Sequence, residues 1–245
     1  MKSIFILLLP FIGTTLGASF VFFMKNSINK KYESVLMGLS SGIMIASSIW
    51  SLIIPSIELS KKNIIPFLPP SLGFILGIIF LLILDYLYPN NKKESNSKML
   101  LAITVHNIPE GMAVGVALIS ALKNGSSITM ASAFALSFGI ALQNIPEGAI
   151  VSMPLKSKGY KKNKSFLYGV LSGLIEPISG LITIILLNSV IKIMPYLLSF
   201  ASGAMFFVVA DELIPKYHYN NYSKIGTFYL GIGFIIMMIL DISLG

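Results

Sequence analysis

Long apolar stretches recur along the whole chain, and polar residues gather in the short segments between them. A helix that crosses a bilayer needs about 20 mostly apolar residues, at about 1.5 Å of rise per residue. The strands of a membrane barrel would instead alternate apolar and polar positions. We therefore expect an all-α integral membrane protein with one transmembrane domain. Its eight predicted spans cover approximately residues 4–24, 35–59, 70–88, 98–122, 127–154, 165–189, 194–215 and 225–244.

Composition also indicates a lipid environment. Of the 245 residues, 55% are apolar and 11% are charged, whereas about a quarter of the residues in a soluble domain are charged. Cysteine is absent, which excludes disulfides and thiolate metal sites. Lys2, an apolar stretch and Gly17-Ala18-Ser19 together also fit a signal peptide. Because the apolar run continues through residues 20–24, we interpret this segment as a span.

Positive charge is concentrated in alternate connections. All 18 basic residues are lysines, and 13 of them lie in or beside the connections after spans one, three, five and seven. The positive-inside rule places these connections in the cytoplasm, and both termini outside it. We therefore expect a multi-pass protein of the cell membrane with extracytoplasmic termini. The lysines sit in short loops without a basic domain around them, which argues against binding of nucleic acid.

One hexapeptide occurs twice, as HNIPEG at residues 106–111 and as QNIPEG at residues 143–148. The first and fifth residues of each copy lie four positions apart, on one face of a helix. Consecutive spans cross the membrane in opposite directions, so the two copies run antiparallel at a similar depth. This arrangement is typical of the inverted repeats that transporters place around a binding site at the midplane.

Three glutamates fall inside predicted spans: Glu110, Glu147 and Glu176. One ionised acid at the bilayer centre costs about 2.5–3.5 kcal/mol on insertion scales, and a bound dication or protons would offset that cost. Pro109 and Pro146 remove main-chain donors, so we expect each helix to loosen there. Carboxylate, imidazole and amide oxygen together suit a borderline transition metal. The sequence therefore predicts a metal site inside the membrane.

At these residues the chain resembles the ZIP (Zrt/Irt-like protein) family of divalent-metal transporters. Both hexapeptides are similar to that family's motifs in its fourth and fifth helices, and Gln143 most resembles the prokaryotic GufA-like branch. The resemblance implies two adjacent ion sites bridged by the two motif glutamates. Their implied ligands are Met44, His106, Asn107, Glu110, Gln143, Asn144, Glu147 and Glu176.

Two departures from the family pattern change what the resemblance implies. Asn144 stands where that branch often has Asp, which predicts a weaker second site. Gln143 in place of His makes the first site richer in oxygen, which favours Mn²⁺ or Fe²⁺ relative to Zn²⁺. Further candidate ligands lie near span ends, where ordinary solvation would equally explain them: Glu58 at the outer entrance, and Asp211, Glu212 and His218 at the cytoplasmic exit.

The resemblance implies a transporter of Zn²⁺, and also of Fe²⁺, Mn²⁺ or Cd²⁺, that moves ions toward the cytoplasm by alternating access. Spans one, four, five and six would move against spans two, three, seven and eight. The ions are cargo, no prosthetic group is implied, and small-residue stripes are compatible with a homodimer. An intramembrane metalloenzyme would use the same ligands, but the chain lacks an H-E-x-x-H motif and a spare general base. The same residues would also suit a metal sensor, a structural subunit or an exporter.

Overall fold

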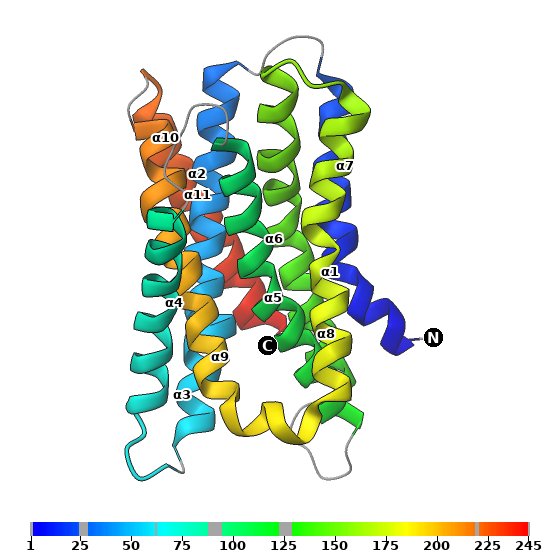
Figure 1. The fold of residues 1–245 in the computed structure, drawn as a ribbon, viewed down its shortest axis with the longest axis vertical. Helices are drawn as coiled ribbons and strands as arrows, with labels where there is room; N and C mark the ends of the chain where they lie inside the picture. The colour runs from blue at the N-terminus through cyan, green and yellow to red at the C-terminus, as the bar shows by residue number, and fades with distance from the viewer. Residues whose placement is uncertain are drawn as a thin grey trace.

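The computed structural model describes residues 2–24, 29–61, 63–87, 95–122, 129–218 and 221–244. Within these, only the backbone is described for residues 2, 84, 85, 95–106, 109, 120, 132, 135, 187–192, 212 and 244. All regular elements of this part of the chain are helical, as predicted. The α-helices are α1 (Lys2–Ser19), α2 (Lys30–Ser47), α3 (Ile54–Ser60), α4 (Leu68–Leu87), α5 (Ser95–Leu122), α6 (Met130–Ser157), α7 (Lys162–Gly173), α8 (Ile175–Ile185), α9 (Leu187–Phe207), α10 (Ile214–His218) and α11 (Ser223–Leu244). They form an elongated bundle (Figure 1).

Three short segments of other helix types continue these helices. The 3₁₀ segment η1 (Phe20–Phe23) extends α1. The π-helical segment η2 (Ser48–Ile53) joins α2 to α3, and a second π-helical segment, η3 (Val208–Leu213), joins α9 to α10. Each π segment ends two residues before a proline, Pro55 or Pro215. Because the π segments keep the chain helical, α2 to α3 and α9 to α10 are continuous rods.

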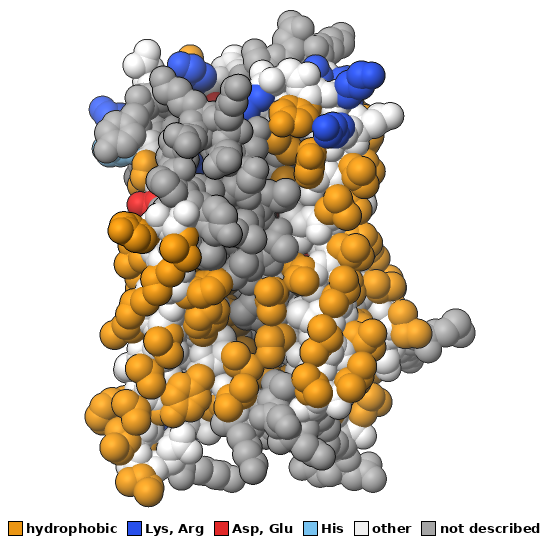
Figure 2. All heavy atoms as spheres, in the orientation of Figure 1, with side chains coloured by type: hydrophobic (Ala, Val, Ile, Leu, Met, Phe, Trp, Pro, Cys, Tyr) orange, Lys and Arg blue, Asp and Glu red, His pale blue; other side chains and the backbone are white. Residues whose placement is uncertain are grey.

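The bundle is apolar outside and polar inside. Figure 2 shows apolar side chains along the length of the visible face, and large apolar residues of α4, α8 and α11 are exposed. Asn, Gln, Glu, Ser and Thr side chains are buried instead. A soluble protein shows the opposite pattern, because its charged residues stay in water. The chain is therefore a membrane protein.

Five helical stretches of the described part are long and apolar enough to cross a membrane: Ser3–Phe23, Lys30–Ser60, Lys162–Ile185, Ile193–His218 and Ser223–Ser243. They correspond to the first, second, sixth, seventh and eighth predicted spans. The third predicted span coincides with a shorter apolar helix, Leu68–Ile83. The fourth and fifth coincide with α5 and α6, which carry the polar hexapeptides.

Several helix boundaries differ from the approximate limits of the predicted spans. Helix α2 begins at Lys30, before the predicted start of the second span at residue 35, because the Asn29 side chain accepts a hydrogen bond from the Lys31 main-chain N–H and caps the helix there. The sixth predicted span is two helices, α7 and α8, separated at Leu174. Helix α9 begins at Leu187, within the predicted end of the sixth span.

The helices pack as two groups. Helices α1, α5, α6, α7 and α8 contact one another, with the most extensive contacts in the pairs α1–α6 and α5–α8. The second group contains α2, α3, α4, α9, α10 and α11, with its most extensive contacts in the pairs α2–α11 and α4–α9. We call these the α6 group and the α9 group.

Glycine allows the closest of these contacts. An added Cβ at Gly13 or Gly17 of α1 would overlap main-chain atoms of Ala141 or Ile145 in α6. A hydrogen bond joins the same pair of helices, because Ser137 Oγ of α6 donates to the carbonyl oxygen of Ile6. The helical donor for that carbonyl would come from residue 10, which is proline and has no N–H. The α1–α6 contact therefore depends on both glycine and a side-chain donor.

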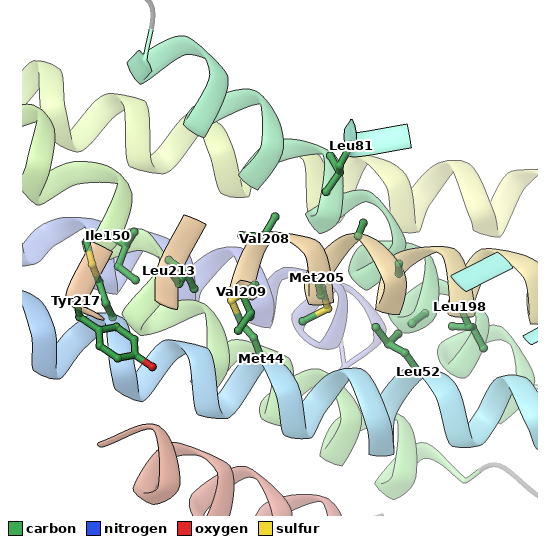
Figure 3. Close-up of a cluster of buried hydrophobic side chains, with 14 of the residues drawn as sticks. Met44, Leu52, Leu81, Ile150, Leu198, Met205, Val208, Val209, Leu213 and Tyr217 are labelled. Carbon is green, nitrogen blue, oxygen red and sulfur yellow. The ribbon is translucent and has the colours of Figure 1, made fainter. Parts of the chain in front are cut away.

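An apolar cluster lies between the two groups. The largest buried apolar cluster includes Met37, Met44 and Met205 of the α9 group, together with Ala113 of α5 and Ile150 of α6. Figure 3 shows Met44, Val209, Leu213 and Tyr217 in this cluster. Long-range hydrogen bonds between described side chains join helices of the same group, as Ser137 does in the α6 group and Ser51, which donates to Asp241, does in the α9 group.

Lysine side chains gather at one end of the bundle (Figure 2). The chain ends are marked in the opposite half of the molecule (Figure 1). The described lysines of the α1–α2, α6–α7 and α10–α11 connections are Lys30, Lys31, Lys156, Lys158, Lys161, Lys162, Lys164, Lys216 and Lys224. The positive charge that the sequence places in alternate connections therefore lies at one end of the folded bundle.

Gly17→Ala is expected to lower the melting temperature of the detergent-solubilised protein. The new methyl group overlaps the Ile145 carbonyl, and overpacking of this kind costs about 1–3 kcal/mol. Gly231→Ala is the matched control, since no heavy atom lies within 4 Å of an added Cβ there. Equal melting temperatures for the two variants would contradict the close α1–α6 contact.

Candidate metal centre

The three glutamates lie together inside the α6 group. Glu110 on α5, Glu147 on α6 and Glu176 on α8 are only 2%, 3% and 1% exposed. Glu110 and Glu147 both lie close enough to Glu176 to repel its charge. Burying even one carboxylate is costly unless hydrogen bonds or a counter-charge compensate. The positions of the surrounding polar side chains therefore matter for stability as well as for binding.

Helix geometry differs from the prediction at the prolines. Helices α5 and α6 continue without interruption past Pro109 and Pro146, so the expected loosening does not break either helix. The break lies at Leu174, between α7 and α8. Pro177 has no N–H to donate to the carbonyl of Gly173, and one helix ends while the next begins there. Glu176 thus lies in the first turn of α8, where the helix dipole favours negative charge.

Two side chains hold one oxygen of Glu176. Thr14 Oγ1 of α1 donates to Glu176 Oε1 at 2.9 Å, and Asn107 Nδ2 of α5 donates to the same oxygen at 3.1 Å. The Asn107 amide is also 3.4 Å from the carbonyl oxygen of Ser172, at the end of α7. Glu176 is therefore linked directly to α1 and α5, and through Asn107 to α7.

The second hexapeptide donates a hydrogen bond to the first. Gln143 Nε2 of α6 donates to Glu110 Oε1 at 2.5 Å. Asn144 is fully buried and lies near Glu176. Its amide is not in hydrogen-bonding geometry with any described residue. One hydrogen bond thus joins the two copies of the hexapeptide.

Several buried oxygens in this interior have no hydrogen-bond partner among the described residues. They are Asn107 Oδ1, Gln143 Oε1, Asn144 Oδ1 and Glu176 Oε2. Leaving a buried acceptor unsatisfied costs about 1–3 kcal/mol. Amide and carboxylate oxygens are ligands for divalent metal ions, and a cation among them would satisfy these acceptors. In the part of the chain whose side chains are described, no three His, Asp or Glu converge closely enough to enclose an ion.

Six of the predicted ligands are buried: Asn107, Glu110, Gln143, Asn144, Glu147 and Glu176. Hydrogen bonds join Gln143 to Glu110 and Asn107 to Glu176, and the role of the six as ligands remains a prediction. His106 lies on α5 one turn before Glu110, and its side chain is outside the described part of the chain. Met44 is buried in the apolar cluster between the two groups (Figure 3). Its role as a ligand remains a prediction.

The candidate ligands at span ends lie outside this centre. Glu58 is exposed and forms an ion pair with Lys61 at 2.6 Å. Asp211 and His218 are exposed in η3 and at the end of α10, and the side chain of Glu212 is outside the described residues. Their proposed entrance and exit roles remain predictions.

Sequence reasoning missed Thr14 and the Ser172 carbonyl. Thr14 and Thr15 are the only polar residues between Ser3 and Ser19 in the first span, and this midspan pair was the signal that could have found the contact. The Ser172 carbonyl could not be found in this way, because the sequence does not show which main-chain oxygen a distant side chain contacts.

Comparisons with known proteins agree with this fold and interior. The sequence profile described as "ZIP Zinc transporter" matches residues 96–241. The chain is 30% identical to Zinc transporter ZIP11 of Xenopus tropicalis, and the alignment covers 95% of this chain and 94% of that protein. It is 32% identical to Zinc transporter ZIPB of Bordetella bronchiseptica, with 96% and 79% covered. It is 30% identical to Zinc transporter GufA of Myxococcus xanthus, with 95% of each chain covered.

Fold and interior together define an all-helical membrane protein with a buried centre of acids and amides. The extent of the profile match and the 32% identity across most of both chains show that the chain belongs to the ZIP family of zinc transporters. This confirms the resemblance inferred from the two hexapeptides. The family and these relatives are named for transport, so the chain is not an enzyme.

Asn107→Asp should destabilise the ion-free protein and increase its stabilisation by Zn²⁺. The substitution removes the donor to Glu176 Oε1 and places a second carboxylate beside it, and a hydrogen bond to a charged group is worth about 1.5–3 kcal/mol. Melting temperatures with and without Zn²⁺ test both effects. Asn163→Asp on exposed α7 surface is the control, and equal behaviour of the two variants would be evidence against the Asn107–Glu176 contact.

Proposed function

We propose that the protein carries Zn²⁺ across the membrane through the centre formed by α5, α6 and α8. The observation that carries this proposal is the burial of three glutamates beside amide oxygens that lack partners among the described residues. A divalent cation would balance the charge and satisfy the oxygens at once. The names of the relatives, all zinc transporters, support the choice of ion.

The Asn107 and Gln143 amides each have two uses. Asn107 donates its N–H to Glu176 while its Oδ1 stays available, and Gln143 donates to Glu110 while its Oε1 stays available. The same side chain can therefore orient a carboxylate and bind the ion. Such preorganisation lowers the cost of ordering the ligands when the ion arrives.

We assign two adjacent ion positions to this centre. The first uses Met44, His106, Glu110, Gln143 and Glu147, and the second uses Asn107, Glu110, Asn144, Glu147 and Glu176. One dication against three carboxylates leaves a net charge of −1, and two leave +1, so both occupancies are electrostatically accessible. Because Asn144 brings no charge, the second position has a lower affinity for its ion than the first. The oxygen-rich ligand set also admits Fe²⁺, Mn²⁺ and Cd²⁺.

Eight spans arranged as inverted repeats agree with the helix contacts. The first span packs on the fifth and the sixth on the fourth, while the second packs on the eighth and the seventh on the third. A two-fold axis that exchanges spans one to three with spans six to eight, and span four with span five, would generate these pairs. The π segments before Pro55 and Pro215 occur in the second and seventh spans, which that axis would also exchange.

The two helix groups suit an elevator-like movement. The α6 group contains the whole proposed centre apart from Met44, and its contact with the α9 group is an apolar cluster. Sliding along such a surface breaks no hydrogen bond between the described side chains. The lysine-rich end faces the cytoplasm by the positive-inside rule, which places both termini on the outer side of the cell membrane. The resemblance to the ZIP family makes net uptake the proposed direction.

Glu110→Ala and Glu147→Ala are expected to abolish saturable Zn²⁺ uptake into proteoliposomes, because each removes a carboxylate shared by both ion positions. Fe²⁺, Mn²⁺ and Cd²⁺ in the same assay rank the ions. Glu33→Gln, in the first turn of α2 and about three helical turns before Met44, is the control that should retain uptake. Unchanged uptake in either alanine variant, or no uptake by correctly inserted wild type, would refute the proposal.

Asn144→Asp is expected to strengthen the second ion position. An added unit charge beside a dication contributes several kcal/mol even with strong screening, so the affinity of that position should rise by about tenfold or more. Calorimetric titration of the purified protein with Zn²⁺ measures affinity and stoichiometry together. An unchanged titration would show that Asn144 does not face an ion position.

A further inference from the structure

Thr14 lies in the middle of α1, where that helix meets α6 and the break between α7 and α8. Its side chain is fully buried. An added Cβ at Gly148 would overlap the main-chain oxygen of Thr14, and one at Gly173 would overlap its side chain. Gly148 follows Glu147 directly, and Gly173 immediately precedes the break at Leu174. Thr14 is therefore fixed between two segments that carry acidic residues of the proposed centre.

The Thr14 hydroxyl lies nearer to a carboxylate on another helix than to the usual acceptor of a buried helical threonine. Thr183 Oγ1 of α8 donates to the carbonyl four residues earlier, that of Ser179, at 2.8 Å. For Thr14 the corresponding carbonyl, that of Pro10, is 3.3 Å away, while Glu176 Oε1 is 2.9 Å away. A hydroxyl has one proton to donate, and the shorter contact goes to the carboxylate on another helix.

Two donors from different helices thus converge on one carboxylate oxygen. Thr14 of α1 and Asn107 of α5 both donate to Glu176 Oε1, and Glu176 Oε2 has no partner among the described residues. A carboxylate held at one oxygen from two directions cannot rotate freely. Its other oxygen keeps a fixed position and remains open to a cation.

We propose that Thr14 is a positioning residue for ion binding, which holds Glu176 Oε1 so that Oε2 is presented to the transported ion. Thr14 does not itself touch the ion. This inference rests on the proposed function and adds to it a residue of the first span. It also explains why α1 belongs to the group of helices that contains the centre, since α1 supplies part of the ligand geometry.

The test compares Thr14→Val, which keeps the shape but removes the hydroxyl, with Thr14→Ser, which keeps the hydroxyl. Zn²⁺ uptake into proteoliposomes gives KM and the maximal rate for each variant. We expect KM to rise by about tenfold in Thr14→Val, because a hydrogen bond to a charged group is worth about one tenfold step in an equilibrium constant. The maximal rate should change little, and Thr14→Ser should restore KM.

Thr183→Val is the matched control. Thr183 is also buried in the α6 group, but its hydroxyl donates only to a carbonyl of its own helix, so KM should stay at the wild-type value.

Thr14→Ala repeats the test with a smaller side chain if the valine variant does not fold. A wild-type KM in the hydroxyl-free variants, or an equal rise in Thr14→Val and Thr14→Ser, would overturn the positioning role and leave the proposed transport intact. Absence of saturable uptake by the wild type would instead overturn the proposed function and, with it, this inference.

Discussion

Three carboxylates inside a lipid-facing bundle are the constraint on which the rest of the structure depends. Each must be kept hydrated, hydrogen-bonded or paired with a cation, since an isolated buried charge is too costly to maintain. Here Gln143 donates to Glu110, and Asn107 and Thr14 donate to Glu176. These donors come from helices that must approach closely, and glycine on α1, α5, α6 and α7 allows that approach. The buried carboxylates can therefore be hydrogen-bonded only if the helices of the α6 group pack closely.

The break at Leu174 belongs to the same requirement. A continuous sixth span would leave every main-chain carbonyl near Glu176 paired within its own helix. Pro177 has no N–H to donate to the Gly173 carbonyl, and the neighbouring Ser172 carbonyl lies beside the Asn107 amide. Asn107 is thus held by main chain on one side and by carboxylate on the other. This fixes the amide so that its oxygen faces the centre rather than its nitrogen.

Much of this could be predicted from the sequence, because the signals were strong and local. Continuous apolar runs predicted an all-helical membrane protein. The repeated hexapeptide predicted a shared polar interior, and within it the structure joins Gln143 to Glu110 and Asn107 to Glu176. The division of the sixth span was missed because its apolar pattern continues across Leu174. The contact of Thr14 with Glu176 was missed because it joins residues 162 positions apart in the sequence. Packing between distant helices decides such contacts, and one sequence does not reveal it.

The apolar cluster between the two groups has a consequence for the energetics of movement. Contacts made by Met37, Met44 and Met205 arise from dispersion, and the flexible, polarizable methionine side chain can refill a displaced gap. In the proposed movement of one group against the other, each contact of these methionines is exchanged for a similar one, and the methionines leave no donor or acceptor unpaired. The barrier to movement should then depend on the shapes of the facing side chains and change little with ionic strength. Hydrogen bonds between the two groups at the same place would instead have to break before the groups could move, which would raise the barrier.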